Sequence, residues 1–269
     1  DSILRNTVKL ANPLSEEQSV MRTLLLPGLL ETVSRNLARK NSSLSFFEVG
    51  TVFIPTTDKL PREVLKVGGI VAGKTELSWH KNMQEMDYFY LKGIVENFLR
   101  ELGIEKAVYV RAADPSYHPG RSAFIMVGDS RLGILGELHP SVLQNYDIKP
   151  RACAFELDVE TLFSLSRKKV MRESITKYPA VERDLAIIVK EEVQAAEAVR
   201  IISDHGSELL QNVNVFDVYV GDPVPVDSKS LAFRITFQAA DRTLTEAEVS
   251  SQMEKIVAAL GEKLNAALR

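Results

Sequence analysis

The sequence predicts an α+β protein in two parts: a mostly antiparallel sheet with flanking helices, followed by a smaller domain in which strands and helices alternate as βαββαβ. Three observations predict this class. Strand-like runs with interleaved helical patterns fill the first 165 residues, which is typical of an antiparallel sheet covered by helices. The stretch from 165 to 176 is polar and basic, as linkers often are. Beyond it the two periodicities alternate regularly, so we expect domains at 1–165 and 176–269.

Three helices are expected in the first domain. Ser15 and Gln18 have the spacing of a capping box, which predicts a helix start. A second helix is predicted to run to Lys40, because apolar residues before it recur at helical spacing: Leu29, Leu30, Val33 and Leu37. Residues 88–102 form the third helix, which Gly103 ends. The expected strands are 44–54, 64–72, 108–111, 122–127, 132–138 and 152–157.

The second domain has a regular order of elements. They are a strand at 184–189, a helix at 194–203, strands at 212–220 and 230–238, a helix opened by the capping box Thr245–Glu248, and a strand at 264–268. This order is the ferredoxin-like motif, a sheet with two helices on one face. Alternation predicts that the core receives Leu231, Phe233, Ile235 and Phe237 from one strand and Phe216, Val218 and Val220 from its neighbour. The residues then expected on the outward face include Val213, Val215, Asp217, Tyr219 and Arg234.

Composition and charge exclude several classes of function. Apolar residues make up 45% of the chain, charged residues 26%, and the net charge is −3. Extensive disorder is therefore not expected, and no global positive field recruits nucleic acid or an anionic membrane. No apolar run approaches the roughly 18 residues of a membrane-spanning helix. The chain starts at Asp1 without an apolar leader, so we interpret it as a piece of a longer protein.

Motifs for common catalytic chemistry are missing from the sequence. The histidines have no partner at metal-ligand spacing, so no metal site is predicted: His80, His118, His139 and His205. Neither a G-x-S-x-G elbow nor a P-loop occurs. The single cysteine, Cys153, fits a reducing compartment, and its apolar strand indicates a buried, inert thiol. Binding is therefore the expected function.

The outward face of the second domain's sheet is the predicted binding surface. Tyr219 can stack a base there and Arg234 can neutralise phosphate, although an ordinary solvent-exposed face is the alternative. Residues 176–269 contain ten Lys and Arg against fifteen Asp and Glu, a net charge of −5. Any RNA contact must therefore use a local patch, with a modest dependence on salt.

Ordered blocks of sequence run along nearly the whole chain. In the first domain they are NPLS at 12–15, MRTLLLPGLL at 21–30, FFEVGTVF at 46–53, HPGRSA at 118–123 and GILGELHP at 133–140. In the second domain they are YPAVERDL at 178–185, FDVYVG at 216–221 and RTLT at 242–245. In this combination they resemble the bacterial phenylalanyl-tRNA synthetase beta subunit family. The resemblance implies the C-terminal third of that subunit.

That resemblance implies a pseudo-catalytic first domain, similar to a class II synthetase core, and a ferredoxin-fold anticodon-binding second domain. The family's catalytic alpha subunit carries a motif that reads roughly AFGLGIERL, where residues 154–162 read AFELDVETL. Glu156 and Asp158 replace glycines that let ATP approach, and Thr161 replaces a phosphate-binding arginine. Such an arginine is worth on the order of 10³-fold or more in phosphoryl chemistry. This segment is therefore expected to be non-catalytic, with no cofactor or metal of its own.

For the whole enzyme, the resemblance implies ATP-dependent joining of phenylalanine to tRNA(Phe) in the cytoplasm, with ATP and Mg²⁺ used on the alpha subunit. The implied partners are the alpha subunit, in an (αβ)₂ heterotetramer, and tRNA(Phe), with no membrane. The helix that ends at Lys40 is either an alpha-subunit interface or part of the domain's own core. Two rival functions are a synthetase paralogue that binds an amino acid or adenylate, and a small-molecule regulatory ferredoxin-like module.

Candidate RNA contacts come from the second domain, and no catalytic residue is predicted. Tyr219 and Arg234 are expected on the open sheet face. The others lie near strand ends and loops: Arg183, Asp217, Lys229 and Arg242. For Arg183, Asp217, Tyr219 and Arg242 the alternative is that they hold the fold, for example through an Arg–Asp hydrogen bond.

Overall fold

The computed structural model describes residues 3–16, 19–57, 60–76, 79, 82–104, 107–166 and 176–269. The chain divides into two compact units, Asp1–Met171 and Arg172–Arg269, each of which is described by itself. Both combine helices with an antiparallel sheet, which confirms the predicted α+β class. Most of the predicted linker, residues 167–175, lies outside the described ranges. Within those ranges, no helix has the length and apolar character needed to cross a membrane.

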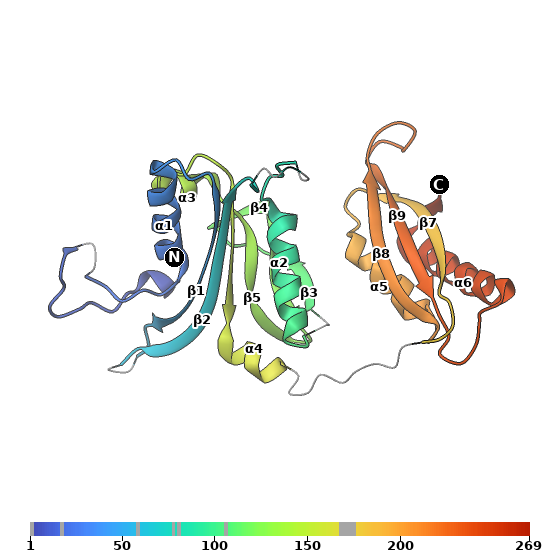
Figure 1. Cartoon of the computed structure of the whole chain (residues 1–269), viewed down its shortest axis with the longest axis horizontal. Helices are drawn as coiled ribbons and strands as arrows, with labels where there is room; N and C mark the ends of the chain where they lie inside the picture. The colour runs from blue at the N-terminus through green and yellow to red at the C-terminus, as the bar shows by residue number, and fades with distance from the viewer. Residues whose placement is uncertain are drawn as a thin grey trace. The chain divides into compact units, whose positions relative to one another are not determined.

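The first unit is built on a six-stranded sheet in the order β1-β2-β6-β5-β4-β3 (Figure 1). Every neighbouring pair is antiparallel. The strands are β1 (Ser43–Ile54), β2 (Arg62–Gly73), β3 (Ala107–Arg111), β4 (Tyr117–Val127), β5 (Ser130–Leu138) and β6 (Ala152–Asp158). All six predicted strands of this domain are therefore present.

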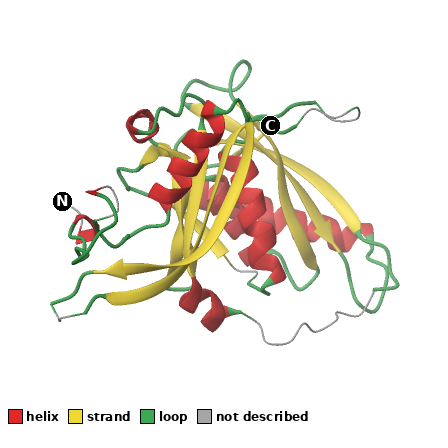
Figure 2. Ribbon diagram, turned by 60° about the vertical axis from the view of Figure 1, so that its left-hand side comes forward, coloured by secondary structure: helices red, strands yellow, loops and turns green. Residues whose placement is uncertain are grey.

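Helices cover both faces of this sheet (Figure 2). A short 3-10 helix, Ile3–Arg5, comes first in the chain. One apolar core contains α1 (Leu26–Ala38) and α3 (Pro140–Asn145), and the other contains α2 (Tyr88–Glu101) and α4 (Val159–Leu165). The antiparallel strands alternate between these two cores, because successive side chains point to opposite faces.

The α1 helix packs its apolar side into its own domain. Leu29, Leu30 and Val33 are 5%, 2% and 0% exposed, and Leu37 packs against the same cluster. Pro27 stands in the first turn, where a missing N–H is tolerated. The own-core alternative for this helix is therefore confirmed.

Other predictions for the first unit need correction. The helix expected to begin at Ser15 does not continue past Ser19, because Val20 pairs with Lys9 in an isolated β-bridge; Gln18 lies outside the described residues. The short helices α3 and α4 are not predicted from sequence. Each has only one or two turns, too few for an apolar periodicity to be read.

The second unit has the predicted ferredoxin-like order. Its elements are β7 (Val181–Lys190), α5 (Ala195–His205), β8 (Leu210–Tyr219), β9 (Ser228–Phe237), α6 (Glu246–Leu264) and β10 (Ala267–Leu268). The sheet order is β10-β7-β9-β8, with antiparallel pairs throughout. Both helices contribute to one core on one face of the sheet. That core contains the four residues predicted from β9, all 0% exposed: Leu231, Phe233, Ile235 and Phe237.

Strand β8 contradicts the predicted assignment of faces before its bulge. Val213 pairs with Ile235 and Val215 with Phe233, so both valines pack against the core. A register shift follows, and Phe216 is half exposed as the extra residue of a bulge. Beyond the bulge the predicted faces hold, because Val218 pairs with the core residue Leu231, although Val218 itself is 55% exposed on this edge strand. Both candidate faces of this strand are apolar, so alternation alone does not distinguish them.

Candidate functional site

The open face of the second unit is the side of the sheet opposite α5 and α6. Asp184, Arg234 and Asn214 form one cross-strand row on this face, because antiparallel partners point to the same side. The next row joins Ala186, Ala232 and Asp217, and the third joins Ile188, Ser230 and Tyr219. The structure thus brings three predicted contacts together on the open face: Asp217, Tyr219 and Arg234.

Arg234 is held in place by two neighbours. Its Nε and Nη2 donate hydrogen bonds to the two carboxylate oxygens of Asp184 at 2.9 and 3.0 Å. The guanidinium carbon lies 5.3 Å from the ring centroid of Phe216, within cation–π range. The hydrogen bond from Arg234 lowers the pKa of Asp184, and the same bond raises the pKa of Arg234. This Arg–Asp pair lies on the open face itself, and it involves none of the residues for which a fold-holding Arg–Asp bond is the alternative: Arg183, Asp217, Tyr219 and Arg242.

Tyr219 has a similar partner at the other end of the face. The guanidinium carbon of Arg269 lies 5.1 Å from its ring centroid, and the Tyr219 hydroxyl donates to the carbonyl of Asp222 at 2.7 Å. Arg269 also donates to Ser230 Oγ at 3.3 Å, and its N–H bonds to the carbonyl of Ala186. Two aromatic–arginine pairs therefore stand on one sheet face.

Small side chains form the floor between these two pairs. Ser230 is 2% exposed and Ala232 is 9% exposed, and Ala186 lies beside Ala232 in the same row. Aromatic rings and guanidinium groups beside small side chains suit stacking of unpaired bases and contact with phosphate. Phe216 and Arg269 are not among the residues predicted from sequence. Phe216 carried an apolar core signal, and Arg269 is an isolated arginine without a motif.

The other three predicted contacts do not share this face. Arg183 pairs across the sheet with a core residue, so it points to the helix side, where it forms an ion pair with Glu246 at the start of α6. Nη2 of Arg242, which precedes α6, lies 2.8 Å from Oε1 of Glu248 in the first turn of that helix. Lys229 donates to a backbone carbonyl at 2.7 Å. Their fold-holding contacts are observed, and their role in RNA binding stays a prediction.

A cleft of about 580 Å³ lies on the α1 face of the first unit, and two of the altered motif residues, Glu156 and Asp158, line it. Glu156 is only 6% exposed. Its Oε1 lies 2.7 Å from Nζ of Lys66, and its Oε2 accepts the N–H of Leu25 at 2.9 Å. Asp158 caps α4, since one carboxylate oxygen accepts both the N–H and the hydroxyl of Thr161 at 2.8 Å. Both carboxylates therefore have structural partners within the domain.

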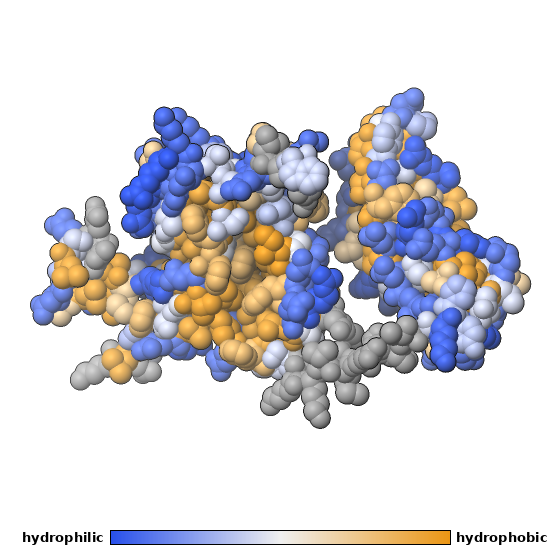
Figure 3. All heavy atoms as spheres, in the orientation of Figure 1, coloured by the Kyte–Doolittle hydropathy of each residue, from blue (hydrophilic) through white to orange (hydrophobic). Residues whose placement is uncertain are grey.

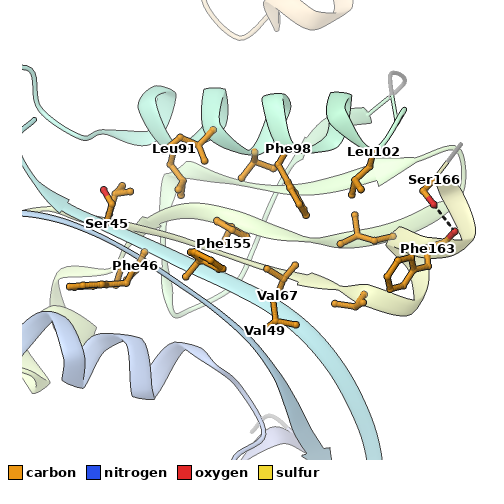
Figure 4. Close-up of a pocket in the computed structure, with 17 residues that line it drawn as sticks. Ser45, Phe46, Val49, Val67, Leu91, Phe98, Leu102, Phe155, Phe163 and Ser166 are labelled. Atoms are coloured by element: carbon orange, nitrogen blue, oxygen red, sulfur yellow. Dashed lines mark hydrogen bonds between the residues drawn. The ribbon is translucent and has the colours of Figure 1, made fainter. Parts of the chain in front are cut away.

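An apolar groove of about 620 Å³ opens on the opposite face of the same sheet. Figure 4 shows its lining, which β1, β2, β6, α2 and α4 supply. Phe47 and Phe163, two of its aromatic residues, are 78% and 68% exposed. Figure 3 shows apolar residues gathered around a hollow in this unit. An exposed apolar surface of this kind is typical of a contact site for another macromolecule.

The cysteine and the described histidines have structural roles. Cys153 is buried, as predicted, and desolvation raises the pKa of its thiol to about 12. His118 Nδ1 accepts the N–H of Gly120, His139 caps α3, and Nδ1 of His205 lies 2.8 Å from the carbonyl of Ile201. His80 lies outside the described residues. Within the described ranges, no group of three His, Cys, Asp or Glu residues is placed to hold a metal ion.

Two family models match successive parts of the sequence. Residues 1–159 match the phenylalanyl tRNA synthetase beta chain CLM domain. Residues 176–269 match the ferredoxin-fold anticodon binding domain. The two matches together cover nearly the whole chain, in the order that the sequence blocks indicate.

Curated relatives match over the full length of the chain. The phenylalanine–tRNA ligase beta subunit of Moorella thermoacetica is 46% identical over 266 residues, covering 98% of this chain and 33% of the relative. The same subunit of Clostridium tetani is 42% identical over 272 residues, covering 100% of this chain and 33% of the relative. The chain thus spans about a third of the length of these relatives. Among solved structures, pyrrolysyl-tRNA synthetase from Desulfitobacterium hafniense is 20% identical, with a TM-score of 0.45 over 61% of this chain and 54% of that one.

Proposed function

The chain belongs to the phenylalanyl-tRNA synthetase beta chain family, and from this premise we propose that it scaffolds a catalytic alpha subunit and binds the anticodon region of tRNA(Phe). The whole enzyme joins phenylalanine to this tRNA in the cytoplasm. ATP and Mg²⁺ act on the alpha subunit, and the assembly is an (αβ)₂ heterotetramer. In this proposal the first unit is the pseudo-catalytic domain and the second unit binds RNA.

The arrangement of side chains on the open face of the second unit is the main support for the RNA-binding proposal. Its two aromatic–arginine pairs, Phe216 with Arg234 and Tyr219 with Arg269, stand beside a floor of small residues. Stacking on an aromatic ring contributes about 1–3 kcal/mol per base. Asp217 stands beside this floor and offers an acceptor for base amino groups. We therefore assign the anticodon contact to the open face and not to the helix side.

The apolar groove and the edge of β1 support the scaffolding proposal. The N–H of Phe53 points out of the sheet edge and donates to the carbonyl of Arg22 at 2.8 Å. By the two-residue period of a strand, the backbone groups of Ser45, Phe47 and Val49 also point outward. Among the described residues none of these three groups has a backbone partner. A long unpaired edge beside an exposed apolar groove is a place where another chain can add to the sheet, and the alpha subunit is the proposed occupant.

Aminoacylation kinetics test the RNA part of this proposal. In the reconstituted enzyme, Tyr219→Ala is expected to lower kcat/KM for tRNA(Phe) at least about fivefold, the lower limit of one lost stacking contact. Phenylalanine-dependent ATP–pyrophosphate exchange, which needs no tRNA, should change far less. Equal losses in both assays would contradict the assignment of this residue to the anticodon contact.

Calorimetry separates this proposal from the rival functions. A synthetase paralogue requires the isolated chain to bind ATP with phenylalanine, whereas we expect no heat of binding. A regulatory ferredoxin-like module requires a polar pocket at a dimer interface and not an exposed face of aromatic and basic side chains. A polar hollow of about 330 Å³ lies between α5 and β8, and the side chains that line it carry no charge.

A further inference from the structure

Arg269 crosses the open face of the second unit from the β10 edge of the sheet. Its N–H bonds to the carbonyl of Ala186, so it continues the pairing of β10 with β7. Ala186 lies on the open face, and antiparallel partners point to the same side, so Arg269 points there too. Tyr219 comes from β8, at the other edge of the sheet. These edge strands are three strand spacings, about 14 Å, apart, so the two side chains meet above β9.

The point where they meet lies over the floor of small side chains. Nη1 of Arg269 donates to Ser230 Oγ at 3.3 Å, and the guanidinium carbon lies 5.1 Å from the Tyr219 ring centroid. Ser230 is 2% exposed although both helices pack on the other face of the sheet, so side chains of the open face cover it. Arg269 contacts its hydroxyl directly. The guanidinium therefore occupies the space through which a base would reach the floor beside Tyr219.

The two arginines of the open face differ in how firmly they are held. Arg234 bonds to both carboxylate oxygens of Asp184, and bidentate, charge-assisted pairs are the strong ones. Among the residues that the structure describes, no carboxylate forms an ion pair with Arg269. Its guanidinium has one long hydrogen bond to a neutral hydroxyl and one cation–π contact, which are weak interactions at an exposed site. Arg234 is therefore fixed, whereas Arg269 is easily released.

We propose that Arg269 is an exchangeable RNA contact, which covers the floor in the free chain and moves from Tyr219 and Ser230 to a phosphate when RNA binds. A base then stacks on the ring that the guanidinium has left, while Arg234 stays bonded to Asp184. The exchange is favourable because a guanidinium without a carboxylate partner gains more from a phosphate than from a neutral ring. This inference rests on the proposed function and deepens it, since it gives the two aromatic–arginine pairs different roles.

NMR with selectively labelled arginine, phenylalanine and tyrosine tests the movement, in the 269-residue chain with and without an anticodon stem-loop of tRNA(Phe). In the free chain, nuclear Overhauser contacts should join the δ-protons of Arg269 to the Tyr219 ring, and Tyr219→Leu should remove them. Saturation with the stem-loop should abolish these contacts in the native chain. The contacts between Arg234 and Phe216 are the internal control and should persist. Arg269–Tyr219 contacts that persist in the saturated complex would overturn the inference.

The salt dependence of binding, measured by fluorescence anisotropy, tests the phosphate contact. Arg269→Ala removes one neutralised phosphate, so its salt slope should be shallower than the native slope by about 0.7 in logarithmic units. Arg269→Lys keeps the charge and should keep the native slope. Arg200→Ala is the matched control, since it removes the same charge from an exposed position of α5, and its slope should also be native. A native slope in Arg269→Ala, or an equal change in Arg200→Ala, would overturn the inference.

The two measurements also distinguish this inference from the proposal on which it rests. If the native chain does not bind the stem-loop, both are wrong. If the native chain binds and Tyr219→Ala weakens binding, but the contacts between Arg269 and Tyr219 persist, only the exchange is wrong and the anticodon assignment stands.

Discussion

Arg234 and Asp184 show how one residue pair connects electrostatics to the candidate site. The hydrogen bond from Arg234 holds the pKa of Asp184 below its ordinary value of 3.8. Since the folded-state value is the lower one, the pair stabilises the fold above about pH 3.8, and this contribution is lost as the pH falls through the lowered pKa. The pair also orients the guanidinium toward the side of the sheet where RNA is proposed to bind.

Arg234→Gln tests this coupling directly. The pKa of Asp184 is expected to rise toward 3.8, because the largest cause of its depression is removed. Side-chain carboxyl signals followed by NMR during an acid titration measure the change. Arg242→Gln is the matched control, since its partner is Glu248 on the helix side, and it should leave Asp184 unaltered. An Asp184 pKa that stays low in Arg234→Gln would rule out the hydrogen bond as its cause.

Cys153 makes a second prediction at this scale. Burial raises the pKa of its thiol from 9.0 to about 12, so between these values the unfolded chain loses a proton that the folded chain keeps. The free energy of unfolding should therefore fall above pH 9, by about 1 kcal/mol between pH 9 and 10 from this group. Urea denaturation at pH 9 and 10 should show this slope in the native chain but not in Cys153→Ala. Equal slopes would mean that the thiol ionises in the folded state.

Individual residues differ in how far their sequence predicts them. The burial of Cys153 is predictable because its neighbours in the strand, Ala152, Ala154 and Phe155, are apolar. The exposure of Phe216 is not predictable, because the bulge that turns it outward is fixed by pairing between β8 and β9. Arg183 belongs to a sequence motif, and the motif does not show whether this arginine binds RNA or an acidic side chain. Only the strand register shows that Arg183 points toward Glu246.

At the scale of elements, helix caps are a measurable source of stability. Thr245 and Glu248 form a complete capping box at the start of α6, as predicted from sequence. Thr245→Ala should lower the free energy of unfolding by about 1 kcal/mol, measured by urea denaturation. Gln194→Ala is the control, because Gln194 occupies the N-cap of α5 without a side-chain hydrogen bond. Equal effects from the two changes would show that the box contributes nothing specific.

Two glycines in regular elements should respond oppositely to alanine. Gly93 lies within α2, with nothing within 4 Å of an added Cβ, so Gly93→Ala should stabilise the fold by roughly 0.5–1 kcal/mol through helix propensity. Gly133 lies in β5, where an added Cβ would come within 2.2 Å of the carbonyl of Glu156. Gly133→Ala should therefore displace β6 and lower the melting temperature. A destabilising Gly93→Ala or a neutral Gly133→Ala would contradict this packing.

Elements were predictable in proportion to their length and regularity. The alternating β9 and the capped α6 carry strong local signals, and the ferredoxin-like order follows from them. The helices α3 and α4 are short and begin at polar caps, His139 and Asp158, so their signal is a single capping residue. The cleft and the groove depend on which strands become neighbours. That order, β1-β2-β6-β5-β4-β3, is not encoded in any one segment.

For the whole molecule, the proposed assembly depends on the apolar groove of the first unit. Phe47→Ser and Phe163→Ser should each weaken association with the alpha subunit by at least about tenfold, as expected for exposed aromatic contacts that become buried. Affinity measured by surface plasmon resonance checks this expectation. Val226→Ser changes an apolar residue that is 90% exposed in the second unit and should have no effect. Unchanged affinity in both phenylalanine variants would place the alpha-subunit contact elsewhere.

The central claim is that this chain acts by binding macromolecules, with the open face as its contact for RNA. Fluorescence anisotropy of a labelled anticodon stem-loop of tRNA(Phe), at two salt concentrations, tests it most directly. Tyr219→Ala and Arg234→Ala should each weaken binding by about 1–3 kcal/mol, while Lys255→Ala, at an exposed position of α6, should change it much less. Two open-face guanidinium groups should give a shallow salt slope of about −1.4 in logarithmic units. Native affinity in both open-face variants, or an equal loss in Lys255→Ala, would contradict the claim.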